Sequence, residues 1–501
     1  MTETKREIER KYESDDSGLP DLTGAGGVAS VLDKGVVELD ATYYDTSDLR
    51  LASASITLRR RTGGSDAGWH LKLPVGPGVR DEIRAPLSDA VPDELAGLVR
   101  SRVREGQLVP VVRLRSSRDV RDLLDAKGRL LAEASVDAVR ADRLFGGEGS
   151  AQWTEIEVEL ADGGDPALLD KVEKRLRKAG VRPSKSASKL ARALAETKGG
   201  HPRPKDPAPA EPVTAGDHVL AYIRAQRDAI VELDPAVRQD APDAIHDMRV
   251  ATRRLRSTFR SFRTVLDREV TDPIGAELKW LAGELGVGRD HEVLVERLGG
   301  ALDELPPILV SGPVHDRLRT WAKAGEHGSR RLLFGVLDSQ RYLTLLDTLD
   351  AVVADPPTLK AAARKPDKVL AKAVRKDFAK VSALVEEAME QPPGHDRDES
   401  VHEARKKAKR TRYAAETATP AIGGAAKRLA KCMKALQSLL GEHQDSVMAR
   451  QTLRELSAVA HAAGESTFTY GLLYGREERR AEISEEALPE MWKATRASME
   501  V

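Results

Sequence analysis

Five prolines lie within the seventeen residues 198–214, KGGHPRPKDPAPAEPVT, near the middle of the chain. Proline fixes its own backbone angle and has no amide hydrogen, so such a stretch joins neither a helix nor a central strand. It is typical of a semi-rigid linker exposed to solvent. Before it, apolar and polar residues alternate with a period of two; after it, apolar residues recur with helical spacing. The sequence therefore predicts two domains of different class, residues 1–197 and 215–501, joined by this linker.

The overall composition limits the partners and the compartment of the protein. Its 501 residues include 80 Lys plus Arg and 80 Asp plus Glu, so the net charge is zero and does not indicate a partner of either sign. Any strong electrostatic field must come from local separation of acidic and basic residues. Cys432 is the only cysteine, which excludes a disulfide framework and a cysteine zinc site. The N-terminal segment lacks the apolar core of a signal peptide, and no apolar run of about 18 residues occurs. We expect a cytoplasmic protein with no membrane partner.

The first domain is expected to be built mainly from strands. Two helices are expected outside its sheet, at 91–104 and at 165–179. Eight antiparallel strands suit a sheet that closes on itself, and strand-like alternation occurs in 6–12, 36–45, 55–61, 68–73, 80–84, 110–116, 130–138 and 153–160. The predicted fold class is a multidomain α+β protein with an N-terminal eight-stranded antiparallel β tunnel or barrel and flanking helices.

The polar faces of these strands separate acids from bases. Residues i, i+2 and i+4 of a strand share one face, so Glu155, Glu157 and Glu159 lie together on the last strand. Arg59 and Arg61 share a face on a middle strand. A half-solvated sheet is the simplest interpretation of any single strand, but rows of like charge repel unless something neutralises them. Clustered carboxylates suit Mg²⁺ or Mn²⁺ and arginine forks suit phosphate, so a metal–phosphate ligand inside a charged tunnel would satisfy both signs.

Residues 7–11, EIERK, resemble the ExExK signature of the CYTH superfamily, the triphosphate tunnel metalloenzymes. The similarity covers about residues 3–197 and continues, in the family's order, through YYDT (43–46), LRRR (58–61), WHLKLP (69–74), EIEVEL (155–160) and SKSASK (184–189). It implies a closed tunnel that binds a triphosphate together with Mg²⁺ or Mn²⁺ and hydrolyses a phosphoanhydride bond.

The resemblance also implies roles for individual residues. Glu7, Glu9 and Lys11 are the expected catalytic residues, and an alternative role for Lys11 is to neutralise the two acids. The acids expected to bind the metal are Glu7, Glu9, Asp137, Glu155, Glu157 and Glu159. The bases expected to face the triphosphate are Lys11, Arg59, Arg61, Lys72, Arg84, Arg113, Arg115 and either Lys185 or Lys189. The spacing in SKSASKL leaves the choice between the last two lysines open.

The second domain is expected to be all-α and internally repeated. Helical spacing is found near 215–234, 243–267, 272–286, 290–303, 313–326, 329–352, 367–390, 398–418, 421–441, 443–463 and 466–485. IHDMRVATRRLRSTFR from position 245 matches VHEARKKAKRTRYAAE from position 401, and LGVGRD at 285–290 matches LGEHQD at 440–445. These matches predict a pair of pseudo-repeated helical bundles, at about 215–355 and 360–490.

The two matching helices carry the same row of basic residues. Positions i, i+3, i+7 and i+10 form one stripe of a helix, and His246 with three arginines occupies them in the first copy. A solvated basic face would explain one such helix, but two at matching positions of a repeat indicate a basic groove. A metal site at the histidines lacks a second ligand at suitable spacing, so we expect each histidine to bond phosphate.

This domain resembles CHAD, the conserved histidine α-helical domain, across about residues 215–490. The resemblance implies binding of long-chain inorganic polyphosphate by His246, Arg249, Arg253, Arg254, Arg256, His402, Arg405, Lys406, Lys409, Arg410 and Arg412. Asp290 and Asp445 fit the repeated motif, although helix capping explains them as well. Few aromatic residues lie between the bases, so stacking of nucleic-acid bases has little support and no nucleic-acid partner is expected.

The tandem order resembles that of bacterial CYTH–CHAD inorganic triphosphatases. It implies a hydrolase that splits inorganic tripolyphosphate into pyrophosphate and phosphate and is held on polyphosphate, or on polyphosphate granules, by its helical domain. Two alternatives keep the tunnel, a class IV-type adenylate cyclase and a thiamine triphosphatase, but no adenine pocket is recognisable and Trp69 and Trp153 are the only tryptophans of this half. A third alternative is a polyphosphate-binding protein without turnover, in which inward carboxylates would serve no purpose.

Overall fold

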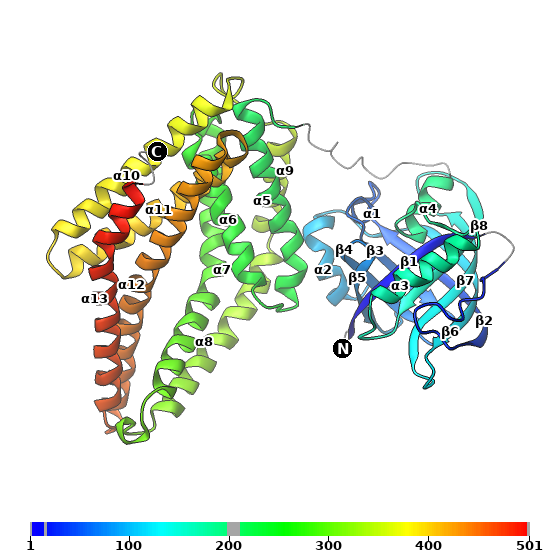
Figure 1. Ribbon diagram of the computed structural model, residues 1–501, viewed down its shortest axis with the longest axis horizontal. Helices are drawn as coiled ribbons and strands as arrows, with labels where there is room; N and C mark the ends of the chain where they lie inside the picture. The colour runs from blue at the N-terminus through cyan, green and yellow to red at the C-terminus, as the bar shows by residue number, and fades with distance from the viewer. Residues whose placement is uncertain (1–2, 15–17, 198–210, 498–501) are drawn as a thin grey trace. The chain divides into compact units, whose positions relative to one another are not determined.

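The fold is that of a computed structural model, which describes residues 3–14, 18–197 and 211–497 (Figure 1). The chain divides into two compact units, residues 1–208 and 209–501. Most of the predicted linker, residues 198–210, lies outside the described residues. The boundaries that the linker sets between the domains therefore stay a prediction.

The first unit is a closed antiparallel barrel. The strands follow the order β5-β4-β3-β2-β6-β7-β8-β1, and pairing of β1 with β5 closes the sheet. They are β1 (Glu3–Ser14), β2 (Ser30–Asp45), β3 (Thr57–Thr62), β4 (Gly68–Gly76), β5 (Val79–Ala85), β6 (Val109–Leu124), β7 (Leu130–Arg143) and β8 (Ser150–Leu160). A two-residue strand, β9 (Arg182–Pro183), also pairs with β1. All eight predicted strands are present, so the predicted barrel is confirmed.

Two helices cover the apolar outer surface of the barrel. α3 (Ala167–Lys178) is amphipathic and packs its leucines on Ile156 and Val158 of β8. α2 (Asp93–Val103) packs on Trp69 of β4 in the same way. Because alternate residues of a strand point to opposite faces, burial of the apolar face under these helices turns the charged face toward the barrel interior.

One part of the barrel interior is filled by apolar side chains and a short helix. Leu190 and Leu194 of α4 (Lys189–Glu196) belong to one cluster with Val112 and Leu114 of β6. The inward face of β6 is therefore apolar at its start and becomes polar further along the strand. The sequence did not predict α4, nor the four-residue helix α1 (Arg50–Ser53).

The second unit is all-α. Its helices are α5 (Ala215–Arg238), α6 (Ala244–Ser261), α7 (Arg268–Asp303), α8 (Val314–Leu337), α9 (Gln340–Ala354), α10 (Pro366–Glu390), α11 (His395–Ile422), α12 (Gly424–Ala462) and α13 (Phe468–Ala497), with a 3-10 turn, η1, at Pro307–Leu309. Successive helices pack from α5 to α8 and again from α10 to α13, and α6 packs on α11 (Figure 1). This arrangement confirms the predicted pair of repeated bundles.

Three predicted interruptions between helices do not occur, one of them within α8, which runs unbroken across the gap predicted between residues 326 and 329. The segments 272–286 and 290–303 form the single helix α7, and the segments 421–441 and 443–463 form α12. Glycines in the matching motifs lower the local helix propensity. Packing along the whole length of each helix outweighs that penalty, because most helical stability in proteins comes from tertiary contacts.

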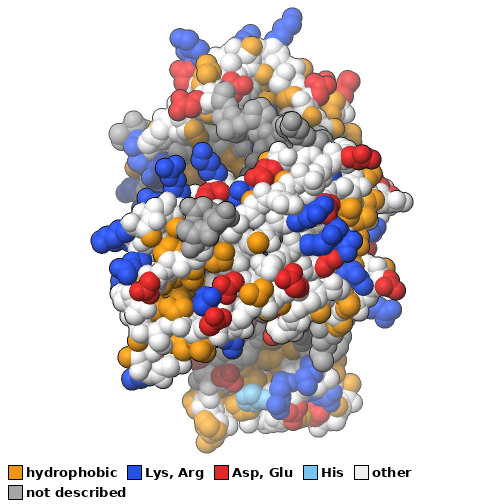
Figure 2. Space-filling model, turned by 90° about the vertical axis from the view of Figure 1, so that its right-hand side faces the viewer, with side chains coloured by type: hydrophobic (Ala, Val, Ile, Leu, Met, Phe, Trp, Pro, Cys, Tyr) orange, Lys and Arg blue, Asp and Glu red, His pale blue; other side chains and the backbone are white. Residues whose placement is uncertain are grey.

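Acidic and basic side chains are mixed on the molecular surface. On the face drawn in Figure 2 they are interspersed with apolar side chains, in keeping with the equal numbers of acids and bases in the sequence. Among the described residues, no helix combines the length and the hydrophobicity that a membrane span requires. In the part of the chain that the structure describes, the face drawn in Figure 2 shows no large region of a single charge.

Candidate functional site

The barrel encloses a cavity of about 370 Å³, here called the bore, whose wall is mostly charged. Seven acidic side chains line it: Glu7, Glu9, Asp66, Glu82, Glu133, Glu157 and Glu159. Ten basic side chains line it: Lys5, Lys11, Lys34, Arg59, Arg61, Lys72, Arg80, Arg84, Arg118 and Lys189. Tyr43 is the one aromatic residue of this wall within the described part of the chain. Both signs of charge thus face a common interior.

Strand β1 places Glu7, Glu9 and Lys11 in the bore. Lys72 of β4 pairs with Glu7, while Lys11 Nζ lies 3.2 Å from Glu9 Oε2 and also pairs with Glu157 of β8. Burial alone would raise the pKa of Glu9, but the ammonium groups of Lys11 and Lys72 lower it to about 2. Lys11 therefore neutralises two carboxylates at once, one on each of two neighbouring strands.

A row of carboxylates, here called the acid row, crosses three adjacent strands of the bore. Glu133 of β7 lies opposite Glu159 of β8, which in turn lies opposite Glu9 of β1. Lys5 Nζ bonds Glu159 at 2.8 Å, yet negative charge remains in excess here. Burial, together with neighbouring acids, raises the pKa of Glu7 to about 7 and also raises that of Glu133. Like charges at directly opposed positions repel, so a cation beside this row would stabilise it.

The donors of the acid row fit a hard divalent cation. Carboxylate oxygens are the ligands that Mg²⁺ and Mn²⁺ prefer. The residues that would hold such an ion are Glu7, Glu9, Glu133 and Glu159. They would have to move closer together, because no three of these described carboxylates have oxygens within 4.8 Å of one another. Glu133 was not among the predicted ligands, although a signal for it existed, because it alternates with Ser135 and Asp137 along β7.

A second group of acids is buried and already surrounds cations of the chain. Oxygens of Asp137, Glu155 and Glu157 lie within 4.8 Å of one another, close enough to share one ion. Lys189 Nζ lies 2.8, 2.8 and 2.5 Å from these three carboxylates. Arg118 donates two hydrogen bonds of 2.7 Å to Asp137. These acids therefore anchor Lys189 and Arg118, and their predicted role as metal ligands would require Lys189 to withdraw.

Glu82 of β5 organises the basic side of the bore. It accepts a hydrogen bond of 2.5 Å from Arg84 Nε and lies 3.0 Å from His70 Nδ1. Nitrogens of Arg59 and Lys72 each lie 3.6 Å from it. Arg84 was predicted to face the triphosphate, but Glu82 was not selected, because its role depends on contacts across three strands.

Positive charge is in excess around Arg61 of β3. Burial and the nearby guanidinium groups of Arg59 and Arg118 lower the pKa of Arg61 to about 9. Asp66, in the loop that follows β3, pairs with Arg61. Guanidinium groups match phosphate oxygens in geometry and charge, so a bound phosphate would relieve the repulsion among these arginines.

Two predicted triphosphate ligands of β6 lie outside the bore. Arg113 Nη2 pairs with Asp40 at 2.5 Å and Arg115 with Asp142 at 3.1 Å, and both arginines are exposed. The apolar residues that alternate with them point inward, where they pack under α4, so the face that we expected to line the bore is the outer one. Arg118, on the inward face further along β6, was missed because the predicted strand ended before it.

The choice between the two C-terminal lysines is decided by the start of α4. Lys189 is buried and lines the bore, whereas Lys185 is exposed. The hydroxyl of Ser188 caps α4 by accepting a hydrogen bond of 3.1 Å from the Ala191 amide. This cap fixes the direction in which the helix begins and so places Lys189 among the acids of the bore.

In the helical unit, the matching helices α6 and α11 bring four bases together. Burial and the charges of three neighbouring arginines lower the pKa of the lysine among them, Lys409, to about 7. Burial and neighbouring arginines also lower the pKa of Arg253. Such mutual effects require short separations in a partly dry environment. We call this group the central basic cluster; it consists of Arg249, Arg253, Arg405 and Lys409.

Each copy of the repeat lays one arginine of this cluster across a glycine of the next helix. Arg249 bonds Asp290 of α7 at 2.6 and 2.9 Å, and a Cβ added at Gly286 would lie 2.6 Å from its guanidinium group. The second copy repeats this on α12, with an ion pair of 3.6 Å and a Cβ distance of 3.2 Å, through Arg405, Asp445 and Gly441. The matching LGVGRD and LGEHQD motifs thus hold matching arginines.

Three other predicted polyphosphate ligands are paired with acids of the helical unit. Arg254 and Arg412 lie 3.4 and 2.8 Å from Glu416. Arg410 pairs with Asp377, which is buried on α10. Each of these arginines therefore has a carboxylate partner that does not belong to the central basic cluster.

The remaining predicted ligands differ in exposure. His402 is half-buried with Nδ1 2.8 Å from Gln444, whereas His246 is exposed. Arg256 is half-buried, and Lys406 is exposed and pairs with Glu403. The two histidines of the repeat therefore do not have equivalent surroundings.

The barrel, with acids and bases facing one bore, and the helical unit, with its paired basic helices, define a triphosphate tunnel protein fused to a helical basic domain. The CYTH domain model matches residues 5–194 and the CHAD domain model residues 221–454. Two uncharacterised proteins of Mycobacterium tuberculosis, from strains CDC 1551 and H37Rv, are each 41% identical over 511 residues, which covers 98% of this chain and 97% of theirs. The chain belongs to the CYTH–CHAD family, and its barrel is of the class that acts on phosphoanhydrides with divalent cations.

Three solved structures are similar to parts of the chain. PptA from Streptomyces chartreusis is 20% identical with a TM-score of 0.48 and covers 56% of this chain and 99% of its own. The CHAD domain of the plant Ricinus communis is 23% identical with a TM-score of 0.42 and covers 58% and 92%. A putative adenylate cyclase from Bacillus halodurans is 19% identical with a TM-score of 0.26 and covers 38% and 97%.

Proposed function

We propose that the barrel hydrolyses inorganic tripolyphosphate to pyrophosphate and phosphate with Mg²⁺ or Mn²⁺, and that the helical unit binds long-chain inorganic polyphosphate. The observation that carries the first half is the bore itself, where an acid row with excess negative charge lies in the same cavity as arginines with excess positive charge. A cation and a polyanion bound together would relieve both.

The charge count of the bore favours a cation beside this ligand. When Asp137 and Glu155, which pair with Lys189, are added to the seven acids of the wall, ten bases stand against nine acids among the described residues, a formal excess of one positive charge. Fully ionised tripolyphosphate carries roughly five negative charges, and one divalent cation reduces that number to about three. A bound cation would therefore offset part of the charge that tripolyphosphate brings into the bore.

The chain's own residues divide the work of hydrolysis. A divalent cation, when bound by Glu7, Glu9, Glu133 and Glu159, supplies charge neutralisation and a more acidic water. The carboxylates of the acid row are placed to take the proton of the attacking water. Arg59, Arg61 and Lys72 stabilise charge on the departing phosphoryl group. Lys11 holds Glu9 in place rather than attacking phosphorus.

The bore favours a linear substrate over a nucleotide or thiamine triphosphate. Tyr43 is the aromatic side chain of its wall, and it is buried and lies 3.4 Å from Arg59 Nη1. Trp69 donates its indole hydrogen to the Ser88 carbonyl and Trp153 donates to Glu155, so both are used in the fold. An adenine or thiazolium ring would find no free aromatic surface among the described residues of the wall.

A substrate panel tests the catalytic half of the proposal. The full chain is incubated with tripolyphosphate, ATP or thiamine triphosphate in Mg²⁺, Mn²⁺ or EDTA, and phosphate and cyclic AMP are measured. We expect phosphate release from tripolyphosphate, its loss in EDTA, and recovery when the cation is restored. Cyclic AMP from ATP would support the cyclase instead, and binding of phosphate without release under any divalent ion would support a non-catalytic polyphosphate-binding protein.

The central basic cluster supports polyphosphate binding by the helical unit. The charges of Arg249 and Arg405 help to lower the pKa of Lys409 and of Arg253, which is unfavourable unless an anion joins these bases. Repeated phosphate groups along one chain would offer each base its own anionic partner. Localisation to the cytoplasm, and to polyphosphate granules where they form, would follow from this binding.

A further inference from the structure

A second concentration of positive charge lies at the corner between α11 and α12. A groove of about 530 Å³ there, here called the α11–α12 groove, contains one acid, Glu416. Its five bases are Arg412 of α11 and Lys427, Arg428, Lys431 and Lys434 of α12. None of the eleven predicted polyphosphate ligands other than Arg412 belongs to it.

The four bases of α12 are arranged unfavourably for an isolated helix. They are exposed and form no ion pair with any described residue. Lys427, Lys431 and Lys434 follow one another at four- and three-residue spacing, so like charges share one stripe. Lys427 and Arg428 also lie near the N-terminal end of α12, where the helix dipole is positive, and the first turn contains no acid and no side-chain cap.

The matching helix of the first repeat shares only part of this charge, since Lys279 occupies the position of Lys434 but no lysine occupies the other two positions of the stripe. α7 begins after Asp267, whose side chain accepts from the Glu269 amide at 2.9 Å. When the LGVGRD and LGEHQD motifs are aligned, Asp272 of α7 occupies the position of Lys427, and Arg268 pairs with this aspartate at 2.6 Å. The first copy therefore has the usual acidic start of a helix, and only the second has a basic start.

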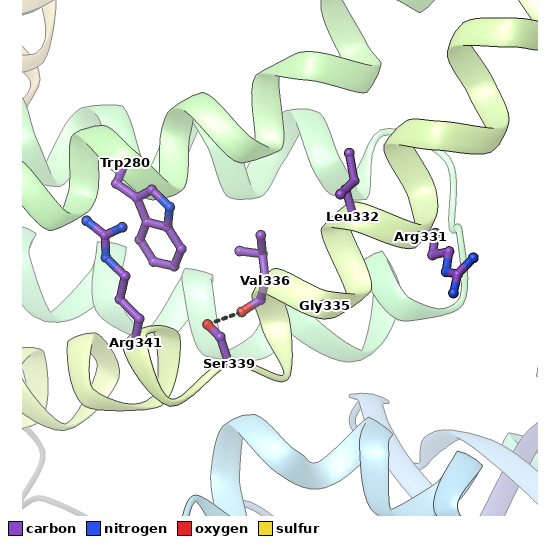
Figure 3. Close-up of a pocket in the computed structure, with 7 residues that line it drawn as sticks. All are labelled: Trp280, Arg331, Leu332, Gly335, Val336, Ser339 and Arg341. Atoms are coloured by element: carbon purple, nitrogen blue, oxygen red, sulfur yellow. Dashed lines mark hydrogen bonds between the residues drawn. The ribbon is translucent and has the colours of Figure 1, made fainter.

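Another groove of the helical unit has a different wall. It has a volume of about 670 Å³ and lies among α7, α8 and α9 (Figure 3). Its Arg341 lies 4.1 Å above the ring of Trp280 and pairs with Glu277 at 2.6 Å. Leu332, which is 65% exposed, contributes an apolar wall. The α11–α12 groove differs in the four bases of α12, which form no ion pair with any described residue, although its Arg412 is paired with Glu416.

Arg412 connects the α11–α12 groove to the central basic cluster. It stands on the same stripe of α11 as Arg405 and Lys409, at seven and three residues from them. At the usual rise of an α-helix, Arg405 and Arg412 are about 10 Å apart along the axis. A linear anion that lies on this stripe would therefore pass from the cluster to the groove.

We infer that the α11–α12 groove is a second binding site for long-chain inorganic polyphosphate, which continues the path from the central basic cluster. The inference rests on the proposed binding function of the helical unit. Phosphate groups at regular spacing satisfy the row of unpaired lysines. No aromatic side chain lines the groove within the described residues, so it offers no stacking surface to nucleic-acid bases.

The test compares three full-length proteins. The groove variant is Lys427→Gln/Lys431→Gln/Lys434→Gln. A control variant, Lys279→Gln/Lys323→Gln/Lys493→Gln, removes the same charge from α7, α8 and α13. Affinity for long-chain polyphosphate is measured over a salt series, and tripolyphosphate hydrolysis is measured in parallel. We expect the groove variant to bind about tenfold more weakly, with a slope of log affinity against log salt that is smaller by about two, because three anion contacts are lost.

Each outcome decides a separate question. Equal affinity and equal salt slope for the groove and control variants would overturn the second site while leaving polyphosphate binding by the wild-type protein intact. A wild-type protein that binds no polyphosphate would overturn the proposed binding function together with this inference. Single-stranded RNA that displaces polyphosphate at equal charge concentration would overturn the assignment to polyphosphate. Unchanged tripolyphosphate hydrolysis in all three proteins is expected, because none of the changed residues lines the bore.

Discussion

The bore and the central basic cluster both gather arginines and lysines, but only the bore interleaves them with carboxylates. Seven acids stand among ten bases in the bore, whereas the cluster has two acidic partners, Asp290 and Asp445. A surface that binds a polyanion needs little more than the bases. A site that also holds a cation and accepts a proton needs acids within reach. The difference predicts turnover in the bore and binding without turnover in the helical unit.

Removal of one carboxylate from the acid row should separate the two functions most strongly. In Glu9→Gln, we expect tripolyphosphate hydrolysis to fall by about 10²–10⁴-fold, because a ligand of the expected cation loses its charge. Polyphosphate affinity should not change. Steady-state phosphate release and equilibrium binding measure the two effects on one preparation.

A matched control for this variant exists on the same strand. Glu13 of β1 is exposed by about two-fifths at its side chain and pairs with Arg192 rather than with a base of the bore. Glu13→Gln should retain hydrolysis within about threefold, as expected for a surface ion pair. Equal loss of activity in the Glu9 and Glu13 variants would show that charge on β1 in general, and not the acid row, supports turnover.

Removal of bases from the helical unit should produce the opposite separation. In Arg249→Gln/Arg405→Gln, we expect polyphosphate affinity to fall by about 10- to 100-fold, because each arginine offers charged hydrogen bonds to phosphate. Hydrolysis of tripolyphosphate should be unchanged. Arg268→Gln/Arg496→Gln removes the same charge from exposed positions of α7 and α13. If this control lost as much affinity, net charge rather than the cluster would account for binding.

Lys409 gives polyphosphate binding a pH dependence of its own. Burial and the charges of Arg405, Arg253 and Arg249, partly opposed by Asp445, lower its pKa from 10.5 to about 7. Bound phosphates would raise that pKa again, so binding takes up a proton above about pH 7. Polyphosphate affinity should therefore fall as pH rises from 7 to 8, by at most about tenfold.

The lowered pKa of Lys409 also makes the stability of the folded protein depend on pH, and this dependence can be measured independently of binding. Between about pH 7 and 10.5, the unfolded chain holds a proton on Lys409 that the folded chain has released, so this residue makes stability rise with pH across that window. Below about pH 7 the charged lysine is disfavoured in the folded state. In Lys409→Met, polyphosphate affinity should depend less on pH. The free energy of unfolding should also lose the part of its pH dependence that comes from Lys409. A wild-type affinity that does not change between pH 6 and 8 would contradict the assignment.

The sequence predicted the barrel and the inward charge because strand alternation is a local property. Eight period-two segments are sufficient to propose a closed sheet, and apolar residues such as Ile156 and Val158 identify the face that helices cover. Alternation does not say which face is inward where the barrel interior itself is apolar. For this reason Arg113 and Arg115 were assigned to the bore, whereas Arg118 was missed because the predicted strand ended before it.

Roles that depend on contacts between distant strands or helices were not predictable in this way. Glu133 and Glu82 each lie on a recognisable strand, but their importance comes from acids and bases on neighbouring strands. The repeat motifs were found in the sequence, yet nothing local reveals why LGVGRD and LGEHQD both contain a glycine. The structure gives the reason, since an arginine of the preceding helix lies across each one.

The role of these glycines can be tested with one substitution that should change polyphosphate affinity without lowering thermal stability. Gly286→Ala should weaken polyphosphate binding by about three- to tenfold, because the added methyl group would displace the Arg249 guanidinium, 2.6 Å away. Thermal stability should not fall, since alanine favours a helix over glycine by about 1 kcal/mol and the group that must move is the end of a flexible side chain. Gly283→Ala, on the same helix with no atom within 4 Å of its added Cβ, is the matched control. If both alanine variants bound polyphosphate as the wild-type protein does, the exact position of Arg249 would not affect binding. The central basic cluster would then bind polyphosphate through its charge alone and would not depend, as the bore does, on the exact placement of its side chains.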